Sequence, residues 1–146
     1  KIFGSSGADK EDETHFGSTR VSFADCYLDE TWKKKAIDNR WLLTEEKSEN
    51  VIDRIKGTAR DPRFIERVPE GTEFKFLLTF KVLQDGDDTL FNTVLLDGLK
   101  LLEMDAIGGS GSRGYGRIKF TQLLLNGNDI TTNFNERNPI AQEAMK

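Results

Sequence analysis

The chain has 146 residues, of which 36% are hydrophobic, and its formal net charge is −4 at pH 7. This length supports one compact core and is too short for two. The negative charge excludes a protein that coats nucleic acid with its whole surface, because phosphate contacts need local positive potential. One cysteine and one histidine exclude an internal disulfide and a zinc site, and no apolar run approaches the ~20 residues that span a bilayer, so we expect a cytoplasmic protein.

The first half of the chain begins with a predicted strand and continues into a long connection. Residues 20–28, RVSFADCYL, alternate apolar and polar side chains, which predicts the strand. The connection covers residues 29–72, and segments of this length are more often functional than idle. Within it, WKKKAIDNRWLL predicts a short helix. Trp32 and Trp41 in this helix either stack on bases or pack against the sheet or a neighbouring subunit.

The second part of the connection predicts a protruding hairpin. Residues 49–68, ENVIDRIKGTARDPRFIERV, read as two extended arms around a polar tip at ARDP. The charged residues of segment 54–67 are Arg54, Lys56, Arg60, Arg63 and Arg67 against Asp61 and Glu66. In an extended arm Arg63 and Arg67 share one face, which suits a row of phosphates. The alternative is that Arg60, Arg63 and Arg67 form surface salt bridges with Asp61 and Glu66.

The second half predicts two strands and one helix. Residues 73–83, EFKFLLTFKVL, alternate cleanly and predict a strand. Residues 89–104, TLFNTVLLDGLKLLEM, have the spacing of a helix with one buried face, which Gly98 weakens slightly. Residues 117–125, RIKFTQLLL, suggest a final strand, and residues 126–146 predict a polar, loosely held tail.

These elements together predict an α+β fold. The order strand, connection, strand, helix, glycine loop, strand matches the second half of a ferredoxin-like β-α-β-β-α-β fold. We therefore expect one domain over residues 1–125 with an insertion at about 29–72. The first strand and first helix of that fold are expected to be missing from this chain.

A glycine-rich loop, GGSGSRGYG, separates the predicted helix from the last strand. Gly109, Gly111 and Gly114 spell G-x-G-x-x-G, but a dinucleotide site must leave a strand and open a helix, and this loop does the reverse. The bare backbone instead offers successive N–H groups to an anion. Arg113 and Arg117 add phosphate contacts, and Tyr115 adds a stacking surface. A turn that lets helix and sheet pack closely remains the alternative.

Three stretches of the chain resemble the RAMP superfamily of CRISPR proteins, and within it the repeated backbone subunit of type III-A (Csm) effector complexes. They are FGSS at residues 3–6, ENVIDRIKGTARDPRFIERVPEGTEF, and LLDGLKLLEMDAIGGSGSRGYGRIKF. The resemblance implies a modified RNA-recognition-type fold and a filament of identical subunits along a guide RNA. It also implies that the hairpin at residues 48–68 acts as a thumb that bends the guide, while the glycine loop lies beside the RNA backbone.

The residues that pattern and resemblance together assign to RNA are divided between the hairpin and the loop. They are Arg54, Arg60, Arg63, Arg67, Gly109, Gly111, Arg113, Gly114, Tyr115, Gly116 and Arg117. The partners that the resemblance implies are guide RNA, target RNA, identical subunits and other subunits of the effector complex, with no membrane.

The resemblance also implies a nuclease. The complete subunit of this family cuts target RNA with a divalent metal, Mg²⁺ or Mn²⁺, through an aspartate in an N-terminal part that these residues do not include. We therefore assign no catalytic residue and no metal ligand to this chain. Two alternatives stay open: a purely structural RNA-binding subunit, and a guide-precursor processing enzyme in which His15 acts as general base. The acidic residues near His15 read as solvated surface.

Overall fold

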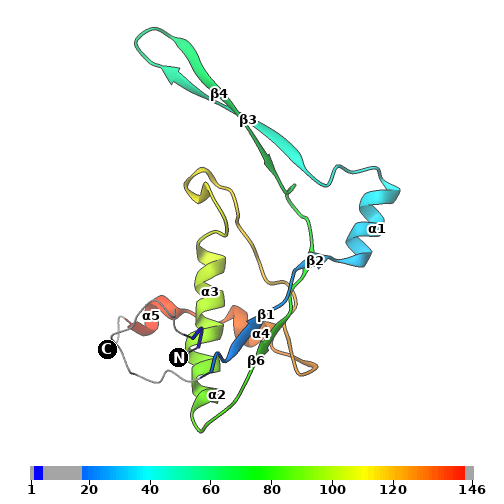
Figure 1. Ribbon diagram of the computed structural model, residues 1–146, viewed down its shortest axis with the longest axis vertical. Helices are drawn as coiled ribbons and strands as arrows, with labels where there is room; N and C mark the ends of the chain where they lie inside the picture. Colours follow the sequence, from blue (N-terminus) through cyan, green and yellow to red (C-terminus); the bar gives the residue numbers. More distant parts are fainter. Residues whose placement is uncertain (1, 5–17, 144–146) are drawn as a thin grey trace. The chain divides into compact units, whose positions relative to one another are not determined.

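The fold divides into two units, one formed by Lys1–Ser22 with Phe80–Lys146 and the other by Phe23–Thr79. The computed structural model describes residues 2–4 and 18–143. Within these residues the strands form four two-stranded sheets, and the chain also contains several helices, so it mixes α and β structure, as expected (Figure 1). No helix among the described residues is long and apolar enough to cross a membrane.

The main helical segment of the first unit confirms the helix predicted at residues 89–104. It consists of α2 (Asp87–Leu90), the π-helical turn η1 (Phe91–Leu95) and α3 (Leu96–Met104), which follow without a break. Leu95, Leu96 and Leu99 are buried. Burial of this apolar face is what holds a helix of such modest length in place.

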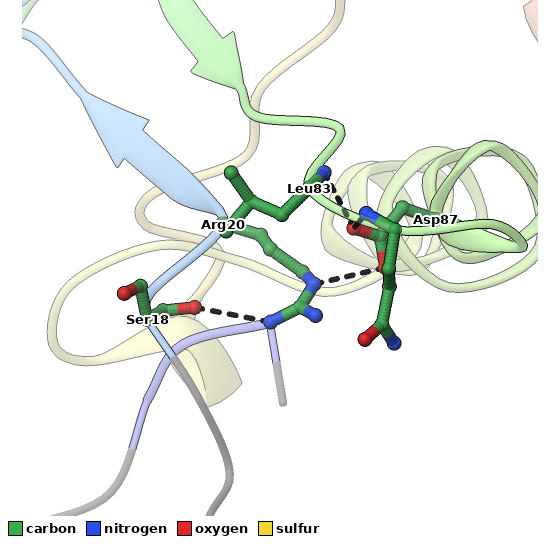
Figure 2. Close-up of polar contacts among 5 residues, drawn as sticks. Ser18, Arg20, Leu83 and Asp87 are labelled. Carbon is green, nitrogen blue, oxygen red and sulfur yellow. Dashed lines mark hydrogen bonds and ion pairs between the residues drawn. The ribbon is translucent and has the colours of Figure 1, made fainter.

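A buried ion pair connects the start of this helical segment to the residue just before strand β1 (Val21–Phe23). Arg20 is 4% exposed and Asp87 is fully buried. Arg20 Nε donates to Asp87 Oδ1 at 2.9 Å and its Nη1 donates to the Ser18 carbonyl at 3.0 Å (Figure 2). The other carboxylate oxygen accepts from the backbone N–H groups of Leu83 and Gln84 at 2.9 and 3.2 Å. The pair is therefore satisfied by hydrogen bonds at both ends, as a buried charge requires.

The C-terminal residues of the first unit are structured, in contrast to the loosely held tail that we expected. Strands β7 (Leu124–Leu125) and β8 (Asn128–Asp129) form a tight hairpin, followed by α4 (Thr131–Asn135) and α5 (Pro139–Glu143). The hairpin turn has positive φ at both Asn126 and Gly127, which is the conformation that the Asn-Gly pair favours. Phe134 is fully buried and its ring lies 5.6 Å from that of Phe120. This anchor explains why a polar segment is held.

The final strand predicted at residues 117–125 is wrong for residues 117–123, which belong to no ladder. The alternation itself is present, since Ile118 and Phe120 are half-buried while Lys119 is exposed. The Phe120 N–H, however, donates to the Glu103 carboxylate at 2.6 Å. Among the described residues no strand pairs with this segment, so the alternation here belongs to an extended chain outside any sheet.

The predicted strands at residues 20–28 and 73–83 each occur as two short pieces. The first gives β1 (Val21–Phe23) and β2 (Tyr27–Leu28), and the second gives β5 (Phe74–Lys75) and β6 (Leu78–Phe80). β1 pairs with β6, and β2 pairs with β5 in antiparallel register. The sequence alternation therefore located both strand-forming segments while overestimating the length of each strand.

Helix α1 (Glu30–Asp38) of the second unit confirms the short helix predicted in the long connection. Asp29 caps its start by accepting from the backbone N–H groups of Thr31 and Trp32. Those two bonds, that of Trp32 first, hold the pKa of the Asp29 carboxyl below its usual value. Trp32 is buried, with its ring 6.2 Å from that of Trp41, which favours the packing role for this residue.

Candidate nucleic-acid interface

The long hairpin is present in the second unit, but its tip is not where the sequence suggested. Strand β3 (Glu45–Asp53) pairs antiparallel with β4 (Thr58–Arg67), and the two run side by side in Figure 1. The turn covers residues 54–57. The Asp53 carboxylate makes this turn by accepting from the N–H groups of Ile55 and Lys56, and Gly57 supplies the positive φ.

The ARDP segment, expected at the tip, lies inside β4 and marks a bulge. The register shifts between Glu49 and Val51, so that Asp61 and Pro62 together stand opposite the one residue between them. Asp61 has a φ of 47°, and proline cannot donate to a ladder. Aspartate next to proline is a turn signal, but here the chain uses it to insert an extra residue into a strand.

One face of the hairpin carries the predicted arginines. Arg63 stands opposite Glu49, Arg67 opposite Glu45, and Arg60 opposite Val51. Because alternate residues of a strand share a face, Arg63 and Arg67 lie on the same side, as predicted. The bulge brings Arg60 onto this side as well, since it consumes one extra residue. We call this side the arginine face; its members are Glu45, Lys47, Glu49, Val51 and Asp53 on β3 and Thr58, Arg60, Arg63, Ile65 and Arg67 on β4.

The arginines pair with acids, but not with the ones considered from the sequence. Arg67 Nε lies 2.5 Å from Glu45 Oε1, and Arg60 Nη2 lies 3.2 Å from Asp53 Oδ2. Both acids belong to β3, across the ladder, whereas Asp61 and Glu66 are on β4 itself. Glu45 stands directly opposite Arg67, whereas Asp53 is the diagonal neighbour of Arg60, and long side chains on one face reach partners in both positions.

The tip carries a different set of groups. Ile55 is 98% exposed, and Arg54 and Lys56 on either side of it are also exposed. Within the described part of the chain, Arg54 forms no ion pair. The tip therefore combines an exposed apolar side chain with two cations, which the sequence analysis had placed on the arm.

The glycine loop of the first unit is closed at its base by a hydrogen bond from the Ile107 N–H to the Gly116 carbonyl, at 2.9 Å. Gly116 has a φ of 70°, and a Cβ built on it would lie 1.9 Å from the Ile107 carbonyl oxygen. Gly111 is also confined, since its Cβ would meet that of Ala106 at 3.1 Å. The loop itself therefore requires the glycine at position 116, while the space at Gly111 is tight.

The outer part of the loop leaves its backbone open. A short 3₁₀ turn, η2 (Gly111–Arg113), is flanked by left-handed residues at Ser110 and Gly114. The N–H groups of Arg113 and Gly114 bond within the turn. Among the described residues, the N–H groups of segment 109–112 make no hydrogen bond. Consecutive free N–H groups beside left-handed residues form an anion-binding nest.

The side chains of the loop divide into exposed cations and a buried ring. Arg113 and Arg117 are exposed. Tyr115, in contrast, is only 7% exposed, so its ring packs within the first unit and offers no open stacking surface. Gly109 differs from Gly111 and Gly116, because a Cβ built on it meets nothing within 4 Å and its φ is not positive. Nothing within the described chain requires a glycine there.

Other candidate sites give no comparable arrangement. Among the described residues, no three His, Cys, Asp or Glu side chains gather as metal ligands. His15 and its acidic neighbours lie outside the described residues. A shallow cavity of about 310 Å³ in the second unit contains none of the residues assigned to RNA; its lining is Cys26, Tyr27, Leu28, Glu30, Lys33 and Phe74.

Comparison with known proteins gives one family. The model of the RAMP superfamily matches residues 1–119. A protein of Methanocaldococcus jannaschii named CRISPR system Cms endoribonuclease Csm3 is 44% identical over 108 residues, which are 73% of this chain and 42% of that protein. The protein of the same name from Streptococcus thermophilus is 38% identical over 125 residues, 84% of this chain and 54% of that protein. The chain thus spans about half the length of these curated relatives.

Proposed function

Because the chain belongs to the RAMP superfamily, we propose that it forms part of a guide-RNA-binding backbone subunit of a type III-A CRISPR effector complex. In this proposal identical subunits assemble along the guide, and the complete subunit cleaves the target RNA that pairs with it. The observation that carries the proposal is the match to two proteins named Csm3 endoribonuclease over 73% and 84% of this chain.

The fold that we propose is the ferredoxin-like, RNA-recognition-type fold of this superfamily. The helical segment from α2 to α3 and the paired strands β1 and β6 fit its second half. The hairpin of β3 and β4 fits the thumb insertion. The absence of a first strand and helix from this chain stays a prediction.

The proposed RNA contacts are to the backbone rather than to the bases. The free N–H groups of segment 109–112 and the guanidinium groups of Arg113 and Arg117 are donors suited to phosphate oxygens. Contacts of this kind carry no sequence information, and each phosphate neutralised makes binding more sensitive to salt. The loop is therefore suited to a guide whose sequence varies.

Cleavage is proposed only for the complete subunit, with Mg²⁺ or Mn²⁺ polarising a phosphate or activating water. The described residues do not fit such a metal site, since no cluster of ligands is present among them. We assign no catalytic residue here. A structural subunit without nuclease activity is the alternative, and a metal-dependent cleavage assay on the full-length protein distinguishes the two.

Nucleic acid that co-purifies with the protein tests the proposal. The full-length gene product is expressed with its native partners, and bound RNA is extracted and sequenced. We expect RNA of discrete lengths with varied internal sequence, depleted in the variant Arg113→Ala/Arg117→Ala. Lys33→Ala/Lys34→Ala is a control with the same loss of charge on helix α1. Absence of RNA from the wild-type assembly, or equal depletion by both variants, would contradict the assignment.

A further inference from the structure

The hairpin is electrically neutral as a whole. Between residues 45 and 67 its acids are Glu45, Glu46, Glu49, Asp53, Asp61 and Glu66, and its bases are Lys47, Arg54, Lys56, Arg60, Arg63 and Arg67. The two sets are equal in number. An element without net charge does not draw a polyanion from a distance, because steering depends on the summed field. The arginines alone therefore give a misleading picture of this surface.

The carboxylates are also arranged to oppose the arginines individually. Every arginine of the arginine face has a β3 acid beside it: Glu45 bonds Arg67, Asp53 bonds Arg60, and Glu49 stands opposite Arg63. Carboxylate and phosphate bind a guanidinium through the same forked N–H groups. Asp53 and Glu45 thus occupy guanidinium donors of Arg60 and Arg67 that a phosphate would use.

These pairs are open enough to exchange. The side chains of Arg67 and Glu45 are 36% and 41% exposed, and that of Arg60 is 56% exposed. Ion pairs at such exposure contribute little to stability, because water screens them. A stability role is therefore a weak explanation for placing Glu45 beside Arg67 and Glu49 opposite Arg63. A phosphate can replace a carboxylate at these exposed guanidinium groups at small cost.

We propose that Glu45, Glu49 and Asp53 limit the affinity of the arginine face for RNA, by acting as internal anions that phosphate must displace. The inference rests on the proposed function. Its consequence is selectivity: RNA that meets the hairpin alone competes poorly with the carboxylates, whereas RNA already held by another part of the protein is at high local concentration and displaces them. The acids thus restrict binding at the arginine face to RNA that another part of the protein already holds.

The test compares two pairs of acids on opposite faces of the same hairpin. Glu45→Gln/Glu49→Gln removes two charges from the arginine face. Glu46→Gln/Glu66→Gln removes two charges from the other face, where these residues stand opposite each other. Both variants are nearly isosteric and alter net charge equally. The probe is a fluorescein-labelled 40-nucleotide polyuridine RNA, titrated into the full-length gene product at several KCl concentrations.

We expect Glu45→Gln/Glu49→Gln to lower the Kd by about three- to tenfold, because it removes the exposed ion pair of Arg67 and the carboxylate opposite Arg63. The slope of log K against log salt should steepen by about 0.7 for each additional phosphate contact. The control should change the Kd by less than about twofold, because its charges face away from the arginines. A change confined to protein folding would leave the salt slope unaltered.

The outcomes separate this inference from the function on which it rests. If wild-type protein binds the RNA and the two double variants match each other, long-range charge alone acts and the inference is wrong. Weaker binding by Glu45→Gln/Glu49→Gln would also overturn it, since the acids would then be orienting the arginines productively. If neither wild type nor variant binds the RNA, both the inference and the proposed function fail.

Discussion

The hairpin and the glycine loop both carry arginines, yet the charges that surround these arginines in the sequence differ. On the hairpin, the guanidinium groups of Arg60 and Arg67 are held by carboxylates of the facing strand. Around the loop, residues 106–120 contain three basic side chains and no acid. The loop also exposes backbone N–H groups, which remain after any side-chain substitution except one to proline. We therefore expect a basic side chain to contribute less to RNA affinity on the hairpin than on the loop.

The largest expected effect is the loss of stability on substitution of Gly116, because the loop leaves no room for a side chain there. Gly116→Ala places a methyl group against the Ile107 carbonyl, where the built Cβ lies at 1.9 Å, and at a φ that alanine disfavours. We expect a loss of about 3 kcal/mol in the free energy of unfolding. Urea denaturation of the full-length protein measures it. Gly109→Ala is the control, and an equal loss in both would show that the loop base is not the constraint.

Acid titration should weaken the unit that carries the loop. The Leu83 N–H, together with Arg20 and the Gln84 N–H, holds the pKa of the Asp87 carboxyl below its ordinary value of 3.8. A lowered pKa contributes stability above 3.8 that is lost as pH falls through the folded value. Hydrogen exchange between pH 5 and about 3 should show peptides of residues 80–104 opening. Asp87→Asn should remove this dependence, and the exposed Asp88→Asn should not.

The arginines provide the direct comparison of the two elements. Arg113→Ala/Arg117→Ala should weaken RNA binding by about tenfold, because two phosphate contacts are lost. Arg60→Ala/Arg67→Ala, with the same change in charge, should weaken it by only about twofold, because those guanidinium groups already bond carboxylates. Fluorescence anisotropy with labelled RNA measures both. A larger loss from the hairpin pair would reverse the ranking of the two surfaces.

The smallest effect distinguishes a glycine needed by the fold from one needed by a ligand. Gly109→Ala meets no atom within 4 Å in the protein, so stability should change by less than about 0.5 kcal/mol. If RNA backbone approaches here, the added methyl group should still reduce affinity by about threefold. Unchanged affinity would mean that the nest is used from another side, or not at all.

Local patterns in the sequence were informative about both elements. Two extended arms around a polar segment predicted the hairpin, and the even spacing of Arg63 and Arg67 predicted their shared face. Helical spacing predicted the segment that leads into the loop. Such spacings depend only on residues that are close together in the chain, so they can be recognised in a single sequence. The glycine context was equally local, since a loop that leaves a helix and enters an extended segment does not suit a dinucleotide.

The features that the sequence did not predict have a common cause: each depends on a residue that is distant in the chain. The acids that pair with Arg60 and Arg67 are determined by the β3–β4 register, which a bulge at Asp61 shifts. The burial of Tyr115 depends on what packs around it. Residues 117–123 alternate correctly but lack a neighbouring strand among the described residues. Propensity alone contains none of this information.

The hairpin is a two-stranded ribbon of nine and ten residues, and among the described residues neither strand has a further neighbour. Its outer rows of N–H and C=O groups are therefore templates for edge-to-edge aggregation. Closely spaced charges of both signs and a proline-containing bulge are the devices that prevent such growth. We expect the same carboxylates that oppose the arginines also to keep this long exposed ribbon from pairing edge to edge with a second copy.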